Sequence, residues 1–356
     1  MGHAITGGIA SQVTLTRRAV ALGGAAWILA GAGLAGCGGR GGDAATPADV
    51  PAGAAAPSAA VLRTAIVGRG EGDTRLMLET ARIRPEHARF EFSNFASGQL
   101  VIEALNGGSL DLGGMSEIPP VFAAASPIHS FRQIAVLHGD VNNQVVLVPR
   151  TSDVKSLEEL KGKRIGYIRA TTSQYFLIRM LESVGLSWSD ITPIPIGVAD
   201  GLGAFSNGTL DAWAIYGYPI QRLVATEGAR ILKTALGFLS GNYLVSAHVD
   251  ALADPARVEL IRDYLRTVKR GYAWTSAHSD EWAAVISKDI GVPLEYVKDE
   301  FRRRSDVYEL RPVDAAAVAS QQAVADVFVK QGLIANPVDV RGLWDDRFNG
   351  TISGKG

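Results

Sequence analysis

The chain has 356 residues, of which 47% are hydrophobic and 20% are charged, and its formal net charge is −1. This near balance of charge excludes a nucleic-acid binder that relies on a basic surface, and it excludes a polybasic membrane protein. About 295 residues follow position 60, which is enough sequence for two domains of ordinary size.

The N-terminal segment has the three parts of an export signal. Thr16-Arg17-Arg18 precedes an uncharged run of 18 residues, Ala19 to Gly36, and small residues then lead to Cys37. Because Leu34-Ala35-Gly36-Cys37 resembles a bacterial lipobox, we predict that residues 1–36 are a twin-arginine signal and that Cys37 becomes a lipidated N-terminus. The alternative is a retained transmembrane anchor, since 18 residues reach the lower limit for a span, although five glycines weaken it.

The next segment, residues 37–60, consists mostly of Ala, Gly and Pro. It cannot bury enough apolar surface to offset its ordering entropy, so we expect a flexible tether with a reach of about 25 Å. Cys37 is the only cysteine. An intrachain disulfide is therefore impossible, and no thiol remains for catalysis once Cys37 is acylated.

The first part of the body alternates predicted strands with helical segments. The predicted strands lie at 62–68, 88–95, 110–115, 131–139, 143–149, 163–169, 191–197 and 210–217. The predicted helices between them include 97–106, 119–125 and the stretch that follows Thr171. Such alternation is typical of α/β proteins and predicts two mainly parallel sheets flanked by helices.

The C-terminal third is predicted to be mostly helical. A return strand at 241–250 precedes a long helix that Asp254 can cap and Pro255 can begin, and further helices are predicted at 279–289, 293–304 and 313–331. A sheet unit, a second similar unit and a helical return predict two lobes joined by a two-segment hinge. We place the crossings near Pro149 and Ser240, so that 61–149 and 241–356 form lobe I and 150–240 forms lobe II.

Two stretches one hundred residues apart repeat each other, "ALNGGSLDLGGMSEIPP" at 104–120 and "AFSNGTLDAWAIYGYPI" at 204–220. In each copy a helix ends at Gly, a strand begins at Leu-Asp, and the strand end runs into a Pro. Ligands of doubly wound sheets lie at the carboxyl ends of strands, where helix N-termini favour negative charge. We therefore predict four strand-to-helix corners around one anion-binding cleft: 68–72, which contains Arg69, Gly70 and Glu71, then Met115-Ser116-Glu117, 169–173 and 216–218.

Side chains at these corners are the candidate ligand contacts. Four hydroxyls can donate to an anion, or they can be simple helix caps: Ser116, Thr171, Thr172 and Ser173. Tyr216 and Tyr218 end a predicted strand and are candidates to line the cleft, whereas Trp213 lies in mid-strand and is expected in the core. For Asp111 and Asp211 we favour a structural role, in which they bond local N–H groups.

Several stretches together resemble the solute-binding proteins of ABC importers for aliphatic sulfonates, taurine and nitrate. They are "EALNGGSLDLGGMSEIPPVFAAA", "LEELKGKRIGY", "LDAWAIY" and "QQAVADVFVKQGLIANPVDV", and the resemblance runs from about Leu62 to Trp344. It implies a periplasmic-binding-protein-like type II fold whose two lobes close on a ligand. It also implies an exported, lipid-anchored monomer at the outer face of the cytoplasmic membrane or in the periplasm, with an ABC permease and its ATPase as partners.

The resemblance further implies a small organic anion as ligand, an aliphatic or aryl sulfonate first, with taurine, nitrate or a pyrimidine precursor as alternatives. Matched to the family by position are the Ser116-Glu117 corner, Arg169 to Ser173, Asn143 near the outgoing crossing, and Asn242-Tyr243 at the return crossing. Departures from the family occur at 216–219, where Trp-Asp-Pro is usual, and at Arg69-Gly70, where an aromatic residue is usual.

Three of the matched or departing residues carry charge. Arg69 or Arg169 could pair bidentately with a sulfonate or carboxylate, or either could be a solvated rim residue. Glu117 is unfavourable beside an anion, so it could instead bond N–H or hydroxyl donors, or an amine on the ligand.

The same fold also occurs in enzymes, among them desulfinases and pyrimidine-forming enzymes. The desulfinase type relies on a cysteine nucleophile, and here the sole cysteine is Cys37. The six histidines show no paired spacing that would supply a base or a metal site, so we expect no catalysis, no metal and no cofactor. A binding protein is therefore favoured over an enzyme, and a tethered sensor is a third class that the sequence leaves open.

Overall fold

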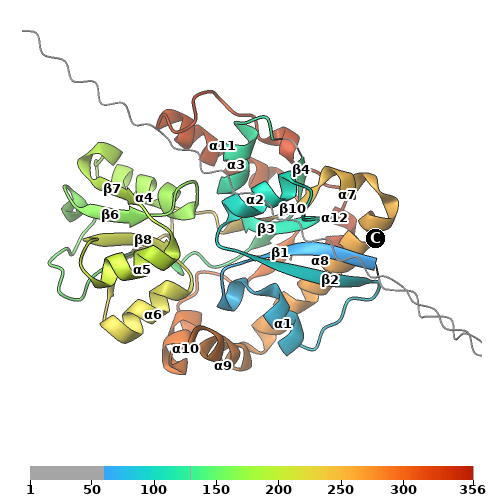
Figure 1. Cartoon of the computed structure of the whole chain (residues 1–356), viewed down its shortest axis with the longest axis horizontal. Coiled ribbons are helices and arrows are strands. Elements are labelled where there is room, and N and C mark those ends of the chain that lie inside the picture. The colour runs from blue at the N-terminus through green and yellow to red at the C-terminus, as the bar shows by residue number, and fades with distance from the viewer. Residues whose placement is uncertain (1–59, 129, 356) are drawn as a thin grey trace, which may run out of the picture. The chain divides into compact units, whose positions relative to one another are not determined.

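The computed structural model describes residues 60–128 and 130–355, whose strands form two sheets (Figure 1). The predicted signal, Cys37 and residues 37–59 of the predicted tether lie outside the described residues. One sheet has the order β11-β4-β10-β3-β1-β2, and we call the elements around it lobe I. Its strands are β1 (Ala60–Val67), β2 (Ala88–Phe95), β3 (Leu112–Ser116), β4 (Phe131–His138), β10 (Asn242–His248) and β11 (Glu309–Arg311).

The second sheet has the order β7-β6-β8-β5-β9, and we call the elements around it lobe II. Its strands are β5 (Gln144–Val148), β6 (Arg164–Tyr167), β7 (Thr192–Pro195), β8 (Ala212–Tyr216) and β9 (Arg230–Thr234). When the strands are numbered within each lobe and each sheet is read from the edge at its second strand, both sheets have the order second, first, third, crossing strand, fourth. The sheet of lobe I continues with β11 beyond the fourth strand. The sequence repeat is therefore the trace of one topology used twice, with β10 and β5 as the crossing strands.

The two-lobed α/β prediction is confirmed, and the sheets are mixed. In both lobes the first strand pairs in parallel with the second and the third. The crossing strand then pairs antiparallel with the third strand and the fourth. Most strands of each sheet still point the same way, as expected, but each crossing strand runs against its neighbours because it enters from the opposite lobe.

Helices from two separate parts of the chain cover the lobe I sheet (Figure 1). The long helix α8 begins where predicted, because the Asp254 carboxylate accepts the N–H of Ala256 and Pro255 occupies the first turn. It packs against β1, β2 and β11. The helices outside lobe II are α1 (Thr74–Thr80), α2 (Gly98–Asn106), α3 (Ile118–Ala124), α7 (Val249–Ala253), α8 (Pro255–Ala277), α9 (Ser279–Ile290), α10 (Leu294–Arg302), α11 (Ala315–Lys330) and α12 (Asn349–Ser353).

Lobe II has three α-helices in the described residues, α4 (Thr172–Ser183), α5 (Val198–Ser206) and α6 (Tyr218–Glu227). Trp213 is fully buried beneath α5, as predicted, where its indole ring lies against Gly201. A β-carbon at Gly201 would lie 2.3 Å from that ring, so the close approach of helix and strand requires a glycine. The helix α10, in the C-terminal part of the chain, contacts α6. This contact brings the C-terminal helices beside lobe II.

All nine predicted strands are present, but the sequence patterns missed several short elements. The strands β9 and β11 and the helices α7 and α12 were not predicted, and the helices α1 and α6 were predicted only through the strand-to-helix corners at 68–72 and 216–218. The predicted return strand at 241–250 ends at His248, and Val249 begins α7. Within residues 60–128 and 130–355, none of the helices combines the length and apolar character needed to cross a bilayer.

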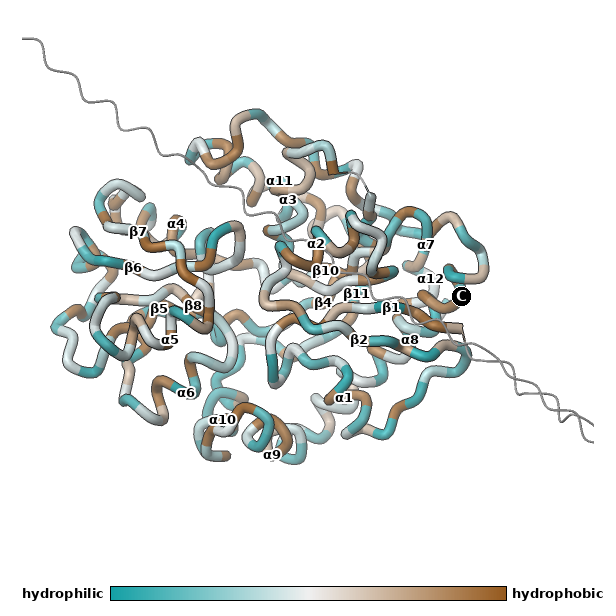
Figure 2. Tube along the Cα trace, viewed as in Figure 1, coloured by the Kyte–Doolittle hydropathy of each residue, from teal (hydrophilic) through white to brown (hydrophobic). Residues whose placement is uncertain are grey.

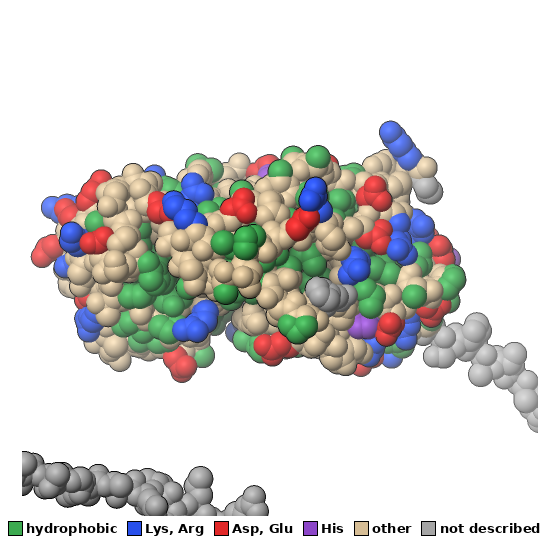
Figure 3. Space-filling model, turned by 90° about the horizontal axis from the view of Figure 1, so that it is seen from above, with side chains coloured by type: hydrophobic (Ala, Val, Ile, Leu, Met, Phe, Trp, Pro, Cys, Tyr) green, Lys and Arg blue, Asp and Glu red, His purple; other side chains and the backbone are tan. Residues whose placement is uncertain are grey.

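Surface charge and core packing agree with the composition. Figure 2 shows hydrophobic and hydrophilic residues alternating along α9 and α10, which bury one face and expose the other. Figure 3 shows basic and acidic side chains interspersed on the face that it presents. That distribution differs from the single-sign surface by which proteins bind nucleic acid.

The repeated Asp111 and Asp211 form the same clasp in both lobes, a structural role as favoured, but the N–H groups that they bond belong to a distant strand and are not local. Asp111 accepts the backbone N–H of Arg63 at 2.8 Å and pairs with its guanidinium. Asp211 accepts the backbone N–H of Arg164 at 2.8 Å and pairs with that guanidinium. Arg63 also donates to the carbonyl of Gly108, and Arg164 donates to the carbonyl of Gly208, the glycine in the turn before each aspartate. The clasp therefore ties the first strand of each lobe to the turn before the third.

The two clasps differ in burial. The Asp111 side chain is 3% exposed and receives a second guanidinium from Arg257, at 2.5 Å, whereas the Asp211 side chain is 33% exposed. Burial would raise the pKa of Asp111, but the hydrogen bonds from Arg63 and the charge of Arg257 outweigh it and hold that pKa below its ordinary value.

We predict that Asp111→Ala lowers the free energy of unfolding by about 3 kcal/mol, because it leaves a buried N–H and two guanidinium groups without their acceptor. The matched change Asp211→Ala should cause a clearly smaller loss, since the Asp211 side chain is itself 33% exposed and pairs with one guanidinium instead of two. Urea unfolding of the two variants and the parent chain measures both losses. Equal losses would contradict the structural difference between the clasps.

Candidate ligand-binding site

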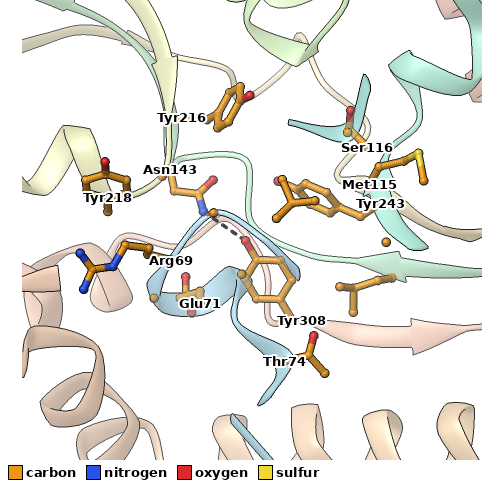
Figure 4. A pocket seen from close by; sticks show the side chains of 18 of the residues that line it. Arg69, Glu71, Thr74, Met115, Ser116, Asn143, Tyr216, Tyr218, Tyr243 and Tyr308 are labelled. Atoms are coloured by element: carbon orange, nitrogen blue, oxygen red, sulfur yellow. Dashed lines mark hydrogen bonds between the residues drawn. The ribbon is translucent and has the colours of Figure 1, made fainter. Parts of the chain in front are cut away.

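A cavity of about 270 Å³ is lined by residues of both lobes and of the C-terminal helices. All four predicted corners contribute to it, so the sequence repeat does place equivalent strand ends around one space. Figure 4 shows ten of the lining side chains by name. The cavity is lined by eleven of the fifteen predicted site residues: Arg69, Gly70, Glu71, Met115, Ser116, Asn143, Thr171, Thr172, Tyr216, Tyr218 and Tyr243.

Four predicted residues are not among those that line the cavity. The Ser173 hydroxyl is fully buried and bonds the backbone N–H and carbonyl of Ile168, while Arg169 is exposed. The Asn242 side chain bonds the imidazole of His138. Glu117 is 2% exposed, and its carboxylate bonds Ser240 at the return crossing and Ser320 of α11. These positions were predicted from their place in the chain, which does not fix the direction of a side chain.

The hydroxyls of the second-lobe corner have divided roles. Thr171 caps α4, where its oxygen accepts the N–H of Ser173 and its O–H donates to the carbonyl of Ile168. Within the described residues the Thr172 hydroxyl has no hydrogen-bond partner, and it lines the cavity at the N-terminus of α4. The cap alternative therefore holds for Thr171 and Ser173, and Thr172 retains a free donor.

Two further donors lie at corresponding places. Ser116, at the end of β3, lines the cavity, and no partner for its hydroxyl lies among residues 60–128 and 130–355. Tyr216, at the end of β8, is the equivalent residue of lobe II. Burial raises the pKa of Tyr216 to about 12, so its phenol keeps its proton at neutral pH and can donate a hydrogen bond. Ser116, Thr172 and Tyr216 thus form a hydroxyl pole of the cavity.

At the first-lobe corner, 68–72, the donor groups of Arg69 and Gly70 are bonded to a residue of α9. Gly70 donates its N–H to the carboxylate of Asp289 at 3.0 Å, and the Arg69 guanidinium pairs with the same carboxylate at 3.4 Å. The Arg69 side chain is 57% exposed, and in Figure 4 it points away from Tyr243 and Tyr308, toward the side where Tyr218 lies. The corner therefore holds α9 in place and offers the cavity fewer donors than the sequence suggested.

The two crossing segments meet at one edge of the cavity. Tyr243 donates its O–H to the backbone carbonyl of Asp140 and accepts the amide of Gln144 at 2.8 Å. Asn143 donates to the Tyr308 hydroxyl at 3.1 Å, the dashed line in Figure 4. Gln144 begins β5 and Tyr243 lies in β10, so these bonds join the two crossing segments of the hinge at the edge of the cavity.

The C-terminal part of the chain contributes residues that were not predicted as ligand contacts. Tyr264 and Tyr272 come from α8, Glu300 comes from α10, and Tyr308 precedes β11. Tyr272 lies on the long helix that Pro255 begins, and no sequence pattern indicated a ligand contact there. Nothing in the periodicity of these helices distinguishes a face that packs on a sheet from one that closes a cavity.

Carboxylates dominate this side of the cavity. Glu71 pairs with the guanidinium of Arg304, which also stacks on the ring of Phe301, 3.4 Å from its centre. Burial raises the pKa of Glu71, and the Arg304 charge opposes that rise. Burial also raises the pKa of Glu300 well above its ordinary value, and the nearby charges of Glu71 and Asp140 raise it further.

Glu117 lies behind the hydroxyl pole, at the base of the hinge. Its carboxylate accepts hydrogen bonds from Ser240 at 2.6 Å and Ser320 at 3.0 Å, and its backbone carbonyl accepts the amide of Gln321. Burial raises its pKa to about 7, and these hydroxyl bonds limit the rise. Of the alternatives considered for Glu117, the structure realises the bonds to hydroxyl donors.

Glu117→Gln should remove a pH dependence of stability. Because the pKa rises from 4.5 to about 7 on folding, the folded state binds the proton more tightly, and stability falls as the pH rises through that interval. The amide carries no such titration, so relative to the parent chain it should gain about 2–3 kcal/mol of unfolding free energy between pH 5 and pH 8. Urea unfolding at both pH values measures this, and an unchanged difference would contradict it.

In the described part of the chain, no three His, Cys, Asp or Glu side chains are grouped so that they could hold a metal ion. His138, which could have faced the cleft, bonds Asn242 and Asp306 instead and is not among the residues that line the cavity. The chemistry that this cavity offers is hydrogen bonding and charge, with aromatic and apolar surface around them.

Comparison with known proteins places this chain in a family. Residues 95–282 match the family described as NMT1/THI5 like. The chain is 30% identical over 259 residues to an Escherichia coli (strain K12) protein whose assigned role is to bind aliphatic sulfonates, and the match covers 72% of this chain and 80% of that protein.

Two solved structures are similar throughout the body of the chain. The periplasmic aliphatic sulphonate binding protein SsuA from Escherichia coli has a TM-score of 0.70 and 28% identity, covering 81% of this chain and 93% of that one. The alkanesulfonate-binding protein SsuA from Xanthomonas axonopodis pv. citri bound to MOPS has a TM-score of 0.69 and 27% identity, covering 82% and 99%. The chain therefore belongs to the NMT1/THI5-like family, and it has the periplasmic-binding-protein fold of these sulfonate-binding relatives.

Proposed function

We propose that this chain is the extracytoplasmic solute-binding component of an ABC importer and that it captures an organic sulfonate in the cavity between its lobes. The observation that carries the proposal is the hydroxyl pole, where lobe I supplies the free hydroxyl of Ser116 and lobe II supplies Thr172 and Tyr216. The sulfonate-binding names of the similar proteins support the same class of ligand.

The proposed binding mode uses donors from both lobes. The sulfonate oxygens accept hydrogen bonds from Ser116 on one side and from Thr172 and Tyr216 on the other, so the anion draws the lobes together. Thr172 is the first residue of α4, a helix of 12 residues, whose N-terminal dipole adds favourable potential for negative charge. A ligand bound to both lobes stabilises the closed arrangement, which is the form that we propose the permease accepts.

The size of the cavity favours an organic anion over nitrate. A volume of about 270 Å³ corresponds to roughly twenty water molecules, at the ~10–15 Å³ of such space that one water needs. Nitrate would leave most of this space unfilled, whereas a sulfonate with a sizeable organic body would fill it. The apolar side chains Val268, Ile286 and Ile290 line the cavity beyond the hydroxyl pole and suit such a body.

The N-terminal segment completes the proposal. We propose that residues 1–36 are removed on export, that Cys37 is lipidated, and that the following segment tethers the lobes to the membrane beside a permease and its ATPase. The arginine pair at 17–18 and the Leu-Ala-Gly-Cys stretch support this order of events.

Aspartate substitutions test the hydroxyl pole. We predict that Ser116→Asp and Thr172→Asp each weaken sulfonate binding more than about hundredfold, since like charges in contact cost several kcal/mol. The repeat supplies matched controls, because Ser109 and Thr209 are exposed in the turns before β3 and β8. Calorimetry on the full chain in a non-ionic detergent should show unchanged affinity for Ser109→Asp and Thr209→Asp. Undiminished affinity in both pole variants would place the ligand elsewhere.

The lipid anchor is tested separately. Cys37→Ser removes the only thiol that can be acylated, so the variant should lose incorporation of labelled fatty acid and leave the membrane fraction. Cell fractionation and labelling in a bacterial host, with the parent chain beside it, measure both effects. Labelling that persists in Cys37→Ser would contradict the lipobox interpretation.

A further inference from the structure

The cavity has a second pole whose chemistry is opposite to that of the hydroxyl pole. In Figure 4, Glu71 and Tyr308 lie across Asn143 and Tyr243 from the hydroxyls of Ser116 and Tyr216. Glu71 and Glu300 both line the cavity here, together with the tyrosines of α8 and the one before β11. We call Glu71, Glu300, Tyr272 and Tyr308 the acidic pole.

Negative charge at the acidic pole exceeds the positive charge that compensates it. Three carboxyl groups, those of Glu71, Asp140 and Glu300, act on one another, and the buried cation among them is the single guanidinium of Arg304. Arg303 also acts on Glu300 but its side chain is 59% exposed, so water screens it. Asp140 in turn uses its oxygens to accept backbone N–H groups and the Ser305 hydroxyl.

Of the three carboxyl groups, Glu300 has the fewest partners that could stabilise its negative charge. Among residues 60–128 and 130–355 no hydrogen bond reaches its carboxylate, and its Oε1 atom is buried without a partner. Its neighbour Glu71, by contrast, is paired with Arg304. An uncompensated buried carboxylate is costly, so its retention at a ligand cavity points to a positive group that arrives with the ligand.

Aromatic rings surround the same place. Tyr308 lies with its ring centre 6.1 Å from that of Tyr243 and 6.0 Å from that of Tyr272, so three phenol rings adjoin the acidic pole. Ring faces attract cations through their quadrupole, and aromatic rings with carboxylates are the usual environment of organic ammonium groups. Asn143 and Gln144, which line the cavity between the poles, each have a side-chain oxygen that is buried without a donor.

We infer that the ligand of this chain is zwitterionic: its sulfonate binds the hydroxyl pole, and a protonated or quaternary nitrogen binds the acidic pole beside Glu300. The inference rests on the proposed function and narrows its ligand from organic sulfonates to aminosulfonates. The two poles then act on one molecule with opposite charges, and the positive group of the ligand stabilises the ionised form of Glu300, which burial disfavours in the empty cavity.

A matched pair of ligands tests this directly. Trimethylammoniopropanesulfonate and its analogue with a tert-butyl group in place of the trimethylammonium group have the same shape, and only the first carries positive charge. Calorimetry with the full chain in a non-ionic detergent should show that the ammonium compound binds at least about tenfold more tightly. Glu300→Gln should reduce that ratio to about threefold or less while the affinity for the tert-butyl analogue stays the same or rises.

The control variant is Glu295→Gln, an exposed position on the same helix, which should keep the full ratio. The melting temperature of Glu300→Gln should not fall, since the change removes an uncompensated charge, so altered binding is not a result of unfolding. Equal affinity of the parent chain for the two sulfonates, or a full ratio in Glu300→Gln, overturns this inference and leaves the proposed function standing. Failure to bind any sulfonate overturns the proposed function, and this inference with it.

Discussion

Asp140 lies fully buried at the point where the chain leaves lobe I, and the geometry of the cavity depends on its hydrogen bonds. Its carboxylate accepts the N–H groups of Asn142, Asn143 and Ser305, which ties the outgoing hinge segment to the C-terminal helices. Its carbonyl accepts the Tyr243 hydroxyl of the return strand. Three distant parts of the chain are thus fixed around one residue, and the amides and tyrosines that line the cavity take their directions from it.

The architecture was predictable because its signals are periodic and repeated. Alternation of strand and helix gave the α/β class, the two copies of Gly-hydroxyl-Leu-Asp gave two equivalent lobes, and Trp213 and Asp111 took the predicted structural roles. The acidic pole was not predictable in the same way. Glu300 and Tyr308 reach the cavity only because α10 and the chain after it return beside α6, and no local pattern records a contact between residues so far apart. Glu117 and Ser173 were predicted as ligand contacts but do not line the cavity, because hydrogen bonds to Ser240 and to Ile168 hold their side chains.

One departure from the family pattern, at Arg69-Gly70, has a structural role in this chain. At the first corner Arg69 and Gly70 are bound to Asp289, so this corner positions α9 rather than an anion. The adjacent residue Glu71 then faces the cavity with Arg304 behind it. This corner therefore carries a structural contact and a carboxylate, whereas the hydroxyls of Ser116 and Thr172 at the other corners are free.

Each crossing strand lies in the interior of a sheet rather than at its edge. β5 follows directly from β4 of lobe I but pairs with β8 and β9 of lobe II, and β10 follows β9 of lobe II but pairs with β3 and β4 of lobe I. The strands of lobe II, from β5 to β9, are continuous in the chain and are inserted between β4 and β10, so lobe I cannot be excised as a continuous fragment with its sheet intact. Cutting one connection, at 139–143 or at 235–241, would leave a molecule still held together by the other. With new chain ends at either position, one covalent connection would join the lobes instead of two. A bound ligand would then be the second connection between them.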